Sequence, residues 1–450
     1  MAAFLLGEVI AATGGQSSGD SGKRFNAVAT DTRRLEPGSL FIALAGDRFD
    51  GHDYLAAAAE HGAAGVVVSR DDLVIPAGVI AVRVDDTRRA FQALARFHRR
   101  RFAIPIIAIT GSNGKTTTKD MTAAVLSTRF ATLKTEANFN NEIGLPQTLL
   151  RLESEHQAAV VEMGMRGRGE IRDLAAIAMP TIAIVTTVGE THVELLGSID
   201  NIAAAKAELV EAIPASGTVI LNGDNPLVRA MAGNTSAKVV FFGLDHAEIS
   251  ARDIRQTETG VTFECCCPEQ SFGVELAAFG LHNVYNALAA IAAGRELGLS
   301  ADQIRQGLAA FAPDAMRFSV QMLGDYRVIN DAYNASPLSM AAAIDALGDI
   351  AAGRKIAVLG DMLELGEVAV DAHRKIGLRL AQRRIEAVIT VGGLAKHIAA
   401  AAAEAGIQAA ACDTHDEARS CIKTVLRPGD TVLLKGSRGM RMEQLLDLFA

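Results

Sequence analysis

The sequence of 450 residues contains no tryptophan, and aromatic residues make up only 5% of it. So low an aromatic content disfavours an aromatic-rich binding surface. Basic residues are also outnumbered, because 44 lysines and arginines stand against 52 aspartates and glutamates, for a net charge of −8. A general nucleic-acid-binding protein normally carries a basic face, so we expect no nucleic-acid partner. Any phosphate site must then be built locally from backbone amides and a few cations.

Cysteine is scarce as well, with five residues in the chain. Cys265, Cys266 and Cys267 are adjacent and cannot present the C-x-x-C spacing that a zinc site prefers. The other two, Cys412 and Cys421, lie far away in the sequence. We expect all five to be reduced thiols, as in a cytoplasmic protein.

The sequence also lacks a hydrophobic run long enough to span a membrane. The apolar stretch within residues 1–15 has no basic region before it and is interrupted by Glu8, unlike a signal peptide. What is plentiful is glycine, with 41 residues, and apolar side chains, at 49%, a composition typical of a globular α/β chain. We expect a cytoplasmic protein without membrane insertion, and the length predicts about three domains.

The first predicted domain, residues 1–103, is a small α/β unit. Its apolar runs predict strands at 39–44, 64–68 and 79–84, and helices at 54–61 and 87–101. Arg99, Arg100 and Arg101 close the second of these helices. We interpret them as a solvated helix end before a domain boundary rather than as an anion-binding patch.

A repeated alternation of strand, loop and helix follows in residues 104–313. It predicts a mostly parallel sheet covered by helices. A more β-like segment and then an alanine-rich helix end this unit near Pro313. The buried-strand runs lie at 104–110, 158–161, 181–188, 218–221 and 238–242, the β-like segment at 261–275 and the alanine-rich helix at 284–297.

The same alternation returns in residues 314–450. Strands are predicted at 328–330, 355–359, 387–391 and 431–434, and helices at 338–347, 370–383, 394–405 and 417–425. The fold class that we predict is therefore α/β in three domains: a small N-terminal domain, a central domain with a mononucleotide-binding parallel sheet, and a Rossmann-like C-terminal domain.

The strongest local motif is I-T-G-S-N-G-K-T-T at residues 109–117, between a predicted strand and a predicted helix. Glycines allow backbone N–H groups to turn inward around phosphate oxygens, Lys115 supplies a mobile cation, and the Thr116 hydroxyl can bind Mg²⁺. The standard Walker A loop has glycine where Ile109 stands, and the shorter form resembles the ligase branch of P-loop proteins. The motif predicts ATP as the ligand, with further contacts from Gly111, Ser112, Asn113, Gly114 and Thr117.

A carboxylate, Glu162, ends the predicted strand at 158–161. Ligands of parallel sheets gather at the carboxyl ends of the strands. We therefore predict that Glu162 holds Mg²⁺ beside the phosphate loop, where other P-loop proteins usually have aspartate; the alternative is a structural acid.

The order of these motifs resembles the central domain of the Mur ligase family. After the G-x-x-G-K-T-T loop and the strand that ends in Glu162 come a loop histidine, His192, and an A-A-K helix that contains Lys206. The resemblance implies that Lys206 carries a carbamate made from CO₂, which would turn a cation that repels Mg²⁺ into an anionic oxygen ligand. It also implies that His192 completes a second Mg²⁺ site, and that Lys115, Lys206 and His192 are catalytic.

Three further segments resemble ATP- and substrate-binding motifs of the family. The segment 138–146 is similar to the one that follows the phosphate loop, which implies substrate contacts for Asn138 and Asn141. The sequence L-H-N-V-Y-N-A at 281–287 resembles the H-N-x-x-N-A motif. That motif implies that two asparagines lie near the adenine, although helix capping by the first is an alternative. The residues concerned are Asn283 and Asn286, and the ATP-ribose contacts implied across a domain boundary are Arg317 and Asp331.

The C-terminal third resembles the branch of the family that adds a dipeptide. Its motifs are V-I-N-D-A-Y-N-A-S-P at 328–337, the segment 358–366 followed by His373, and 434–443. The first motif implies that Tyr333 and Asn334 contact the dipeptide. The sequence departs from the family pattern at Asn330, Ser336 and Gly439.

Near the other end, two segments look like the family's nucleotide-sugar-binding domain. They are D-T-R at 31–33, with 37–44 after it, and D-G-H at 50–52. The resemblance implies substrate contacts from Thr32, Arg33, Asp50, Gly51 and His52.

The activity that the resemblance implies is ATP-dependent addition of D-Ala-D-Ala to UDP-N-acetylmuramoyl-tripeptide through an acyl phosphate, in the synthesis of peptidoglycan precursors. ATP and Mg²⁺ are the implied cofactors, the partners are small molecules, and we expect a monomer. Two alternatives stay open. A folylpolyglutamate synthetase shares the fold but tends to have G-K-G-S in its loop and lacks the Tyr333-Asn334 motif. A P-loop switch or scaffold would bind nucleotide without ligase activity.

Overall fold

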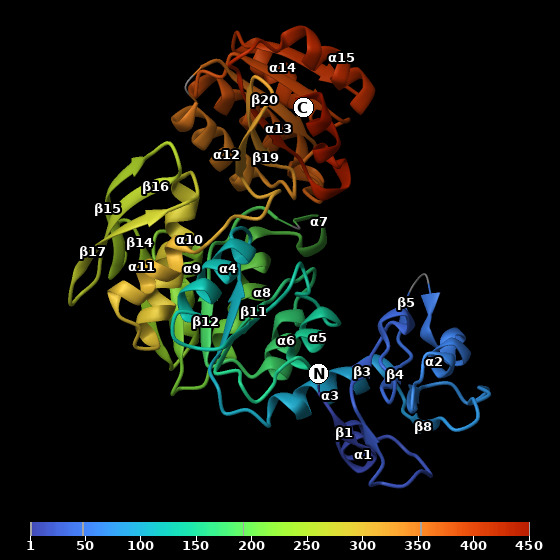
Figure 1. Cartoon of the computed structure of the whole chain (residues 1–450). Coiled ribbons are helices and arrows are strands. Elements are labelled where there is room, and N and C mark those ends of the chain that lie inside the picture. The colour runs from blue at the N-terminus through green and yellow to red at the C-terminus, as the bar shows by residue number, and fades with distance from the viewer. Residues whose placement is uncertain (1, 47–48, 192, 352, 450) are drawn as a thin grey trace.

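The computed structural model of the protein describes residues 2–46, 49–191, 193–351 and 353–449. It consists of three α/β domains, each built around its own sheet (Figure 1). The N-terminal domain is drawn in blue, the central domain in teal to yellow and the C-terminal domain in orange to red. The predicted fold class is confirmed, whereas the domain limits at residues 103 and 313 stay predictions.

The central sheet has nine strands in the order β10-β11-β9-β12-β13-β14-β15-β16-β17. Neighbouring strands from β10 to β15 run parallel, and β15 to β17 form an antiparallel extension. The strands are β9 (Ile106–Thr110), β10 (Thr132–Lys134), β11 (Ala158–Glu162), β12 (Ile182–Val185), β13 (Thr218–Asn222), β14 (Lys238–Gly243), β15 (Ile249–Gln256), β16 (Val261–Cys266) and β17 (Ser271–Leu276).

Helices cover both faces of this sheet, which explains why its inner strands are uninterrupted apolar runs. Alternate residues of β9 belong to two separate hydrophobic clusters, one with α4, α10 and α11 and the other with α3, α5, α6 and α8. The central helices are α4 (Lys115–Leu126), α5 (Gly144–Leu149), α6 (Glu170–Ala178), α7 (Val193–Leu196), α8 (Ile199–Glu211), α9 (Pro226–Ala230), α10 (Leu281–Glu296) and α11 (Ala301–Ala309).

The N-terminal domain has a parallel sheet in the order β3-β4-β7-β8 and two short antiparallel pairs. Its three longer strands lie within the predicted ones. The strands are β1 (Phe4–Leu5), β2 (Arg24–Phe25), β3 (Val28–Ala29), β4 (Leu40–Ile42), β5 (Ala45–Gly46), β6 (Phe49–Asp50), β7 (Gly65–Val68) and β8 (Ile80–Arg83), and the helices are α1 (Leu6–Thr13), α2 (Leu55–Glu60) and α3 (Thr87–Arg99).

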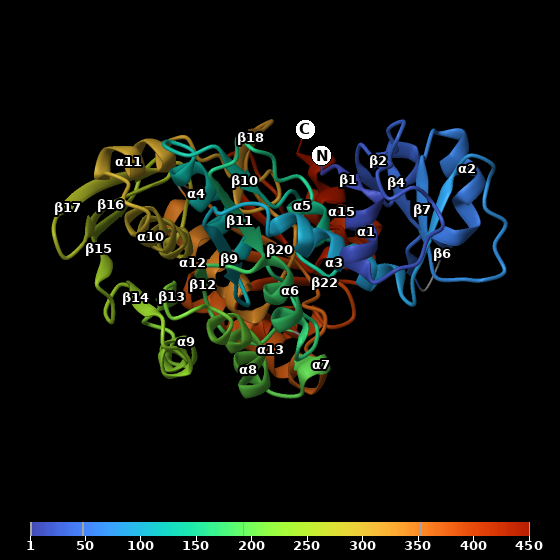
Figure 2. The ribbon, with the colours of Figure 1, turned by 90° about the horizontal axis from the view of Figure 1, so that it is seen from below.

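Helix α3 joins the N-terminal and central domains. It packs against α1 on one side and against α5 and α6 on the other, as Figure 2 shows from below. One continuous hydrophobic cluster therefore runs from Phe4 and Phe91 to Ile106 and Ile177. These two domains therefore share a core.

The expectation of a solvated arginine cluster at the end of α3 is wrong for Arg99. Its side chain is buried, and its guanidinium donates to the carbonyls of Phe102, Ile104, Ala178 and Met179. Two of these carbonyls lie at the C-terminus of α6, where a cation is favourable. Arg101 also packs on the rings of two phenylalanines, whereas Arg100 is exposed as predicted.

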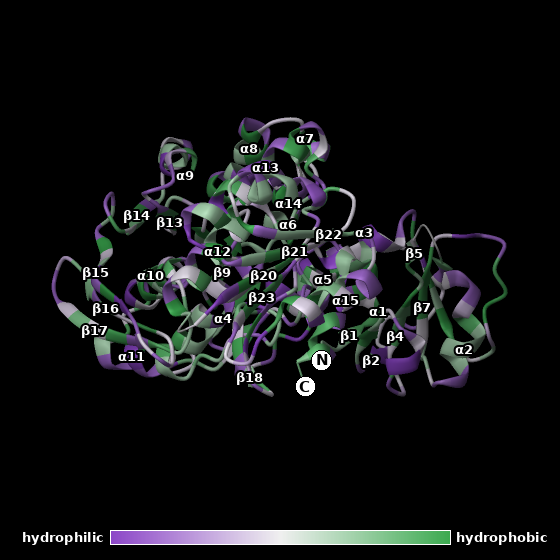
Figure 3. Cartoon of the chain, turned by 90° about the horizontal axis from the view of Figure 1, so that it is seen from above, coloured by the Kyte–Doolittle hydropathy of each residue, from purple (hydrophilic) through white to green (hydrophobic). Residues whose placement is uncertain are grey.

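The C-terminal sheet has six strands in the order β18-β19-β23-β20-β21-β22, and only β18 is antiparallel to its neighbour. Hydrophobic clusters lie on both faces, and Figure 3 shows hydrophobic residues along β20 and β21. The elements are β18 (Ser319–Leu323), β19 (Tyr326–Asp331), β20 (Lys355–Gly360), β21 (Ala387–Val391), β22 (Gln408–Cys412), β23 (Thr431–Lys435), α12 (Pro337–Ile350), α13 (Ala369–Gln382), α14 (Lys396–Glu404) and α15 (His415–Val425).

All five cysteines are free thiols, as expected. None of the helices in the described part of the chain is both long enough and apolar enough to cross a membrane.

We predict that Arg99→Met destabilises the protein by about 2–4 kcal/mol, because four carbonyls that now accept hydrogen bonds lose their donor in a buried place. Urea denaturation followed by circular dichroism measures the loss. The matched control is Arg100→Met, one residue further on and exposed, which should change the stability by less than about 0.5 kcal/mol. Equal effects of the two changes would mean that Arg99 does not join the domains.

Candidate functional site

The phosphate loop lies between the carboxyl end of β9 and the start of α4, as predicted. Gly111 and Gly114 have φ angles of 150° and 82°. A Cβ at Gly111 would lie 1.9 Å from Thr186 Oγ1, and one at Gly114 would lie 2.5 Å from Asn286 Oδ1. Glycine is therefore required at both positions, by the close approach of neighbouring side chains and, at Gly114, by the left-handed backbone as well.

The segment after β12 holds the loop in place. Ser112 Oγ donates to Gly189 O and accepts from Gly189 N, both at 3.0 Å. Thr186 Oγ1 donates to Asn113 O at 2.6 Å. These bonds fix the loop conformation before any ligand arrives.

A buried carboxylate lies next to the loop. Glu162 accepts a 2.8 Å hydrogen bond on each oxygen, from Thr116 Oγ1 and from Asn140 Nδ2. Lys115 Nζ donates to Gly111 O at 2.8 Å. Burial lowers the pKa of Lys115, against the opposing effect of the Glu162 charge. The predicted residues Lys115, Thr116 and Glu162 are thus brought together, and Asn140 joins them.

The oxygens of Glu162 and Thr116 fit Mg²⁺. This cation prefers oxygen ligands and is usually held by one or two carboxylates together with phosphates and waters. Within the described ranges no three His, Cys, Asp or Glu side chains gather to form a metal cage. His192, predicted for a second metal site, lies outside the described residues.

Lys206 is buried in α8 with 2% of its surface exposed. Burial, and secondly the charge of Lys115, hold the pKa of Lys206 well below its usual range. Its amine makes no hydrogen bond or ion pair with the residues that the structure describes. A buried amine with a low pKa is uncharged for part of the time, and only the uncharged amine can attack CO₂.

The two asparagines of the H-N-x-x-N-A motif lie behind the loop. Thr118 Oγ1 donates to Asn286 Oδ1 at 3.1 Å, and Asn286 Nδ2 donates to Asn283 Oδ1 at 3.0 Å. Asn283 does not cap α10, whose cap residue is Gly280. The alternative of simple helix capping is therefore wrong, and this hydrogen-bonded row connects the motif to α4.

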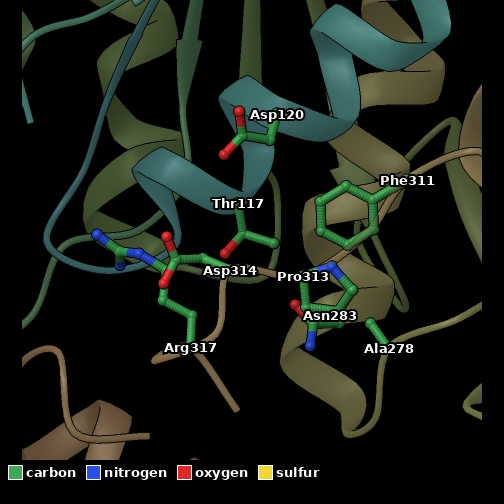
Figure 4. Close-up of a pocket in the computed structure, with 8 residues that line it drawn as sticks. All are labelled: Thr117, Asp120, Ala278, Asn283, Phe311, Pro313, Asp314 and Arg317. Atoms are coloured by element: carbon green, nitrogen blue, oxygen red, sulfur yellow. The ribbon is translucent and has the colours of Figure 1, made fainter. Parts of the chain in front are cut away.

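A narrow pocket separates α4 from the linker to the C-terminal domain (Figure 4). Its volume is about 10 Å³, roughly enough for one water. The lining residues are Thr117, Asp120, Ala278, Asn283, Phe311, Pro313, Asp314 and Arg317.

Two predicted ATP-ribose contacts are engaged by protein groups in this structure. The guanidinium of Arg317 lies 3.9 Å from the centre of the Tyr333 ring. Asp331 Oδ2 accepts from Lys435 Nζ at 2.6 Å, and its Oδ1 accepts from Phe318 N at 3.1 Å. Lys435, in the 434–443 motif, is thus a functional residue of the site that the sequence motif alone does not single out.

The other predicted dipeptide contact, Asn334, is exposed at the carboxyl end of β19. Its backbone carbonyl accepts from Lys435 Nζ at 2.9 Å. The exposed Asn138 and Asn141 lie before α5, where Asn141 Oδ1 accepts from Gly144 N. The residue of this segment that reaches Glu162, beside the phosphate loop, is Asn140, which lies between them in the same asparagine-rich run.

In the N-terminal domain, Thr32 begins a 3-10 turn, and the exposed Arg33 pairs with Asp31. Asp50 caps the turn that begins at Gly51, and it accepts from His52 Nδ1. The predicted substrate residues of this domain thus lie on two capped turns.

The His52 ring is buried, and its Nε2 accepts from Ser69 N at 2.9 Å. Both of its nitrogens therefore serve the fold. Gly51 is required because a Cβ there would lie 2.7 Å from Leu44 O.

Fold and site together define the class: a three-domain α/β protein whose central sheet presents a phosphate-binding loop next to a buried carboxylate. Three family models match the chain, the Mur ligase family catalytic domain at residues 24–99, the Mur ligase middle domain at 109–294, and the Mur ligase glutamate ligase domain at 316–438. The chain belongs to the Mur ligase family.

Individual relatives agree over nearly the whole length. The UDP-N-acetylmuramoyl-tripeptide–D-alanyl-D-alanine ligase of Bacillus subtilis is 39% identical, over 94% of this chain and 92% of the relative. A crystal structure of MurF from Acinetobacter baumannii has a TM-score of 0.93 at 33% identity, covering 100% of this chain and 99% of that one. MurF from Thermotoga maritima in complex with ADP has a TM-score of 0.85 at 28% identity, covering 94% and 96%.

One histidine of the site gives a pH prediction. Burial lowers the pKa of His282 to about 4, against an ordinary 6.5, although the Asp331 charge opposes the shift. Between these two values the unfolded chain binds a proton that the folded chain does not, so this contribution to stability is lost as the pH falls from 6.5 to about 4.

We expect the apparent Tm of the wild type to fall more steeply between about pH 7.5 and about pH 4.5 than that of His282→Gln. Differential scanning calorimetry across this range measures both slopes. Parallel slopes would contradict the assignment of a neutral His282 in the folded protein.

Proposed function

We propose that this chain is an ATP-dependent amide ligase that joins D-alanyl-D-alanine to UDP-N-acetylmuramoyl-tripeptide, a step of peptidoglycan synthesis. The names of its relatives support the two substrates. The observation that carries the reaction type is the buried Lys206 beside Lys115, a lysine without an anionic partner among the described residues. We further propose that it acts as a monomer in the cytoplasm and serves cell-wall growth, cell shape and division.

A carboxylate is a poor electrophile, so the reaction needs two steps. An oxygen of the tripeptide's terminal carboxylate attacks the γ-phosphorus of ATP, and ADP leaves as the acyl phosphate forms. The free amine of D-Ala-D-Ala then attacks the acyl carbon, loses a proton, and displaces inorganic phosphate. Both steps build up negative charge on the phosphoryl group, which the site must stabilise.

Several groups of the chain are suited to stabilising this negative charge. The backbone N–H groups of the loop and the ammonium of Lys115 take up phosphate oxygens. Thr116 and Glu162 would hold Mg²⁺, which supplies neutralisation of the phosphate charge and in-line positioning. Asn140 orients the Glu162 carboxylate through its 2.8 Å hydrogen bond. The C-terminal domain, through Arg317, Asp331 and Tyr333, would cover the nucleotide and exclude water that could hydrolyse the acyl phosphate.

Lys206 fits a carbamate. Its neutral amine adds to CO₂ to give R–NH–COO⁻ and a released proton, and the product is an anion that removes the repulsion from Lys115. The carbamate oxygen would accept a second Mg²⁺, with His192 as the further ligand that we propose. Without the carbamate, the buried Lys206 amine near Lys115 would destabilise the folded protein.

The proposed activity is tested by the release of phosphate. We expect ADP and phosphate to form only when UDP-N-acetylmuramoyl-tripeptide and D-Ala-D-Ala are both present, because the second substrate discharges the acyl phosphate. A coupled assay for ADP with each substrate omitted in turn measures this. Equal or faster turnover with a folate and glutamate would reassign the chain to the folylpolyglutamate branch, and phosphate release without any acceptor would favour a P-loop switch.

A second test addresses Lys206. We predict that Lys206→Ala lowers activity about 100-fold and that acetate partly restores it, because a small carboxylate can occupy the vacated position. Lys206→Arg should not be rescued, because guanidinium keeps its charge, cannot form the carbamate and fills the space.

A direct measurement accompanies the kinetics. The wild type in the presence of ¹³CO₂ should give a carbamate carbon signal in ¹³C NMR that Lys206→Ala lacks. Tolerance of arginine, no effect of acetate and no carbamate signal would together remove the modification from the mechanism.

A further inference from the structure

A hydrogen bond connects the C-terminal domain directly to the phosphate loop. Ser336 Oγ lies 2.9 Å from Asn113 Oδ1, although the two residues are 223 positions apart in the sequence. Ser336 is one of the positions at which the chain departs from the family pattern, and its side chain is buried. The contact therefore belongs to this chain and is not explained by the phosphate-binding motif alone.

The hydroxyl proton of Ser336 has two acceptors within reach, Asn113 Oδ1 at 2.9 Å and Ser339 Oγ at 3.1 Å, and the Asn113 oxygen is the nearer. Ser336 is the N-cap of α12, and its Oγ accepts from Ser339 N at 3.3 Å. The Ser339 hydroxyl has its own acceptor, Ser336 O, at 3.1 Å. Capping uses a lone pair of the Ser336 oxygen, so its proton can point to Asn113.

The carboxamide of Asn113 is only half satisfied. Its Oδ1 accepts from Ser336, but its Nδ2 is buried and has no hydrogen-bond partner within the described part of the chain. A buried donor without an acceptor costs roughly 1–3 kcal/mol. Because Asn113 lies in the loop that takes up phosphate, an oxygen of the nucleotide's phosphate chain is the acceptor that would satisfy it.

Two other contacts join the central and C-terminal domains. Leu338, in the first turn of α12, packs on Gly189 so closely that a Cβ there would lie 2.0 Å from Leu338 Cδ1. Gly189 is itself bonded to Ser112 of the loop. Glu194 N also donates to Glu364 O at 3.4 Å. The start of α12 thus lies against Gly189, which holds the phosphate loop, and a second contact joins α7 to the segment after β20.

We infer that Ser336 is a positioning residue that couples closure of the C-terminal domain to the phosphate chain of the bound nucleotide. It acts through Asn113: the serine hydroxyl fixes the Asn113 oxygen, and this directs the Asn113 N–H groups to a phosphate oxygen. The nucleotide and the closed domain then stabilise each other, because each completes the hydrogen bonds of the same carboxamide. This inference deepens the proposed function, but it can fail independently of it.

The first test measures nucleotide binding, which needs neither of the other substrates. We expect Ser336→Ala to weaken binding of Mg²⁺·AMP-PNP by about three- to tenfold in isothermal titration calorimetry. Ser336→Thr keeps both the cap and the proton and should bind like the wild type. The matched control is Ser339→Ala, which disturbs the start of α12 without touching Asn113 and should leave the affinity within about twofold.

The second test is a double-mutant cycle on Asn113. If Ser336 acts through Asn113, Ser336→Ala should have no further effect on AMP-PNP affinity in an Asn113→Ala background. In the ligase assay, kcat/KM for ATP should fall by the same factor as the affinity, while the KM for the UDP-linked substrate stays unchanged.

Additive losses in the cycle would overturn the coupling, and so would equal losses in Ser336→Ala and Ser339→Ala. If the ligase assay fails for every variant while the calorimetric cycle is non-additive, the proposed function falls and the coupling stands. If the ligase is active but Ser336→Ala binds AMP-PNP as tightly as the wild type, the proposed function stands and the coupling falls.

Discussion

The site depends on the register between β9 and β11. Ile109 pairs with Glu162, and the same strand β9 pairs Thr110 with Val185 of β12. Parallel pairing brings three carboxyl ends to one edge, with the phosphate loop in the middle, the carboxylate on one side and the segment that contacts Ser112 on the other. A slip of one residue in β11 would turn Glu162 to the other face of the sheet and leave Thr116 without its partner. Both faces of β11 are apolar, so the polar partners of Glu162 distinguish this register rather than the hydrophobic pattern.

The edge of the central sheet formed by the carboxyl ends of its strands explains how an acidic chain can bind a polyanion. The positive charge that matters is not spread over a surface but consists of Lys115 and the loop amides, next to a second buried lysine. The Lys115 charge disfavours a charged Lys206, and Glu162 opposes the effect of burial on Lys115 only in part. An anionic phosphate group next to these lysines would therefore be favourable.

The sequence predicted those parts whose signal is local. The phosphate loop, Glu162 and the buried strands of the two larger sheets were predicted from glycine spacing and apolar runs within a few residues. Short or half-exposed elements such as β10, β15 and β22 were not, because their side chains carry no clear periodicity. Asn140 was missed because three neighbouring asparagines are equivalent in sequence, and only the turn before α5 decides which one reaches Glu162.

Contacts between distant segments could not be predicted from the sequence, for a different reason. Arg99 looked like one charge in a basic cluster, and only the position of the α6 C-terminus shows that four carbonyls need it. The Asp331–Lys435 pair and the Ser336–Asn113 bond likewise join residues whose separation in sequence carries no signal. His52 is the opposite case. Its motif implies a contact with a ligand, but in the structure both nitrogens of its buried ring form hydrogen bonds with protein groups.

The shared core around α3 has a consequence for how a substrate is selected. Because the N-terminal and central domains are packed as one body, the distance from the turn at Asp50 to the phosphate loop is fixed by the protein and not by the ligand. For a substrate anchored at its nucleotide end, such a fixed span works as a ruler. Under the proposed function, such a span would distinguish peptides by length, because a peptide one residue shorter reaches about 3.5 Å less when extended.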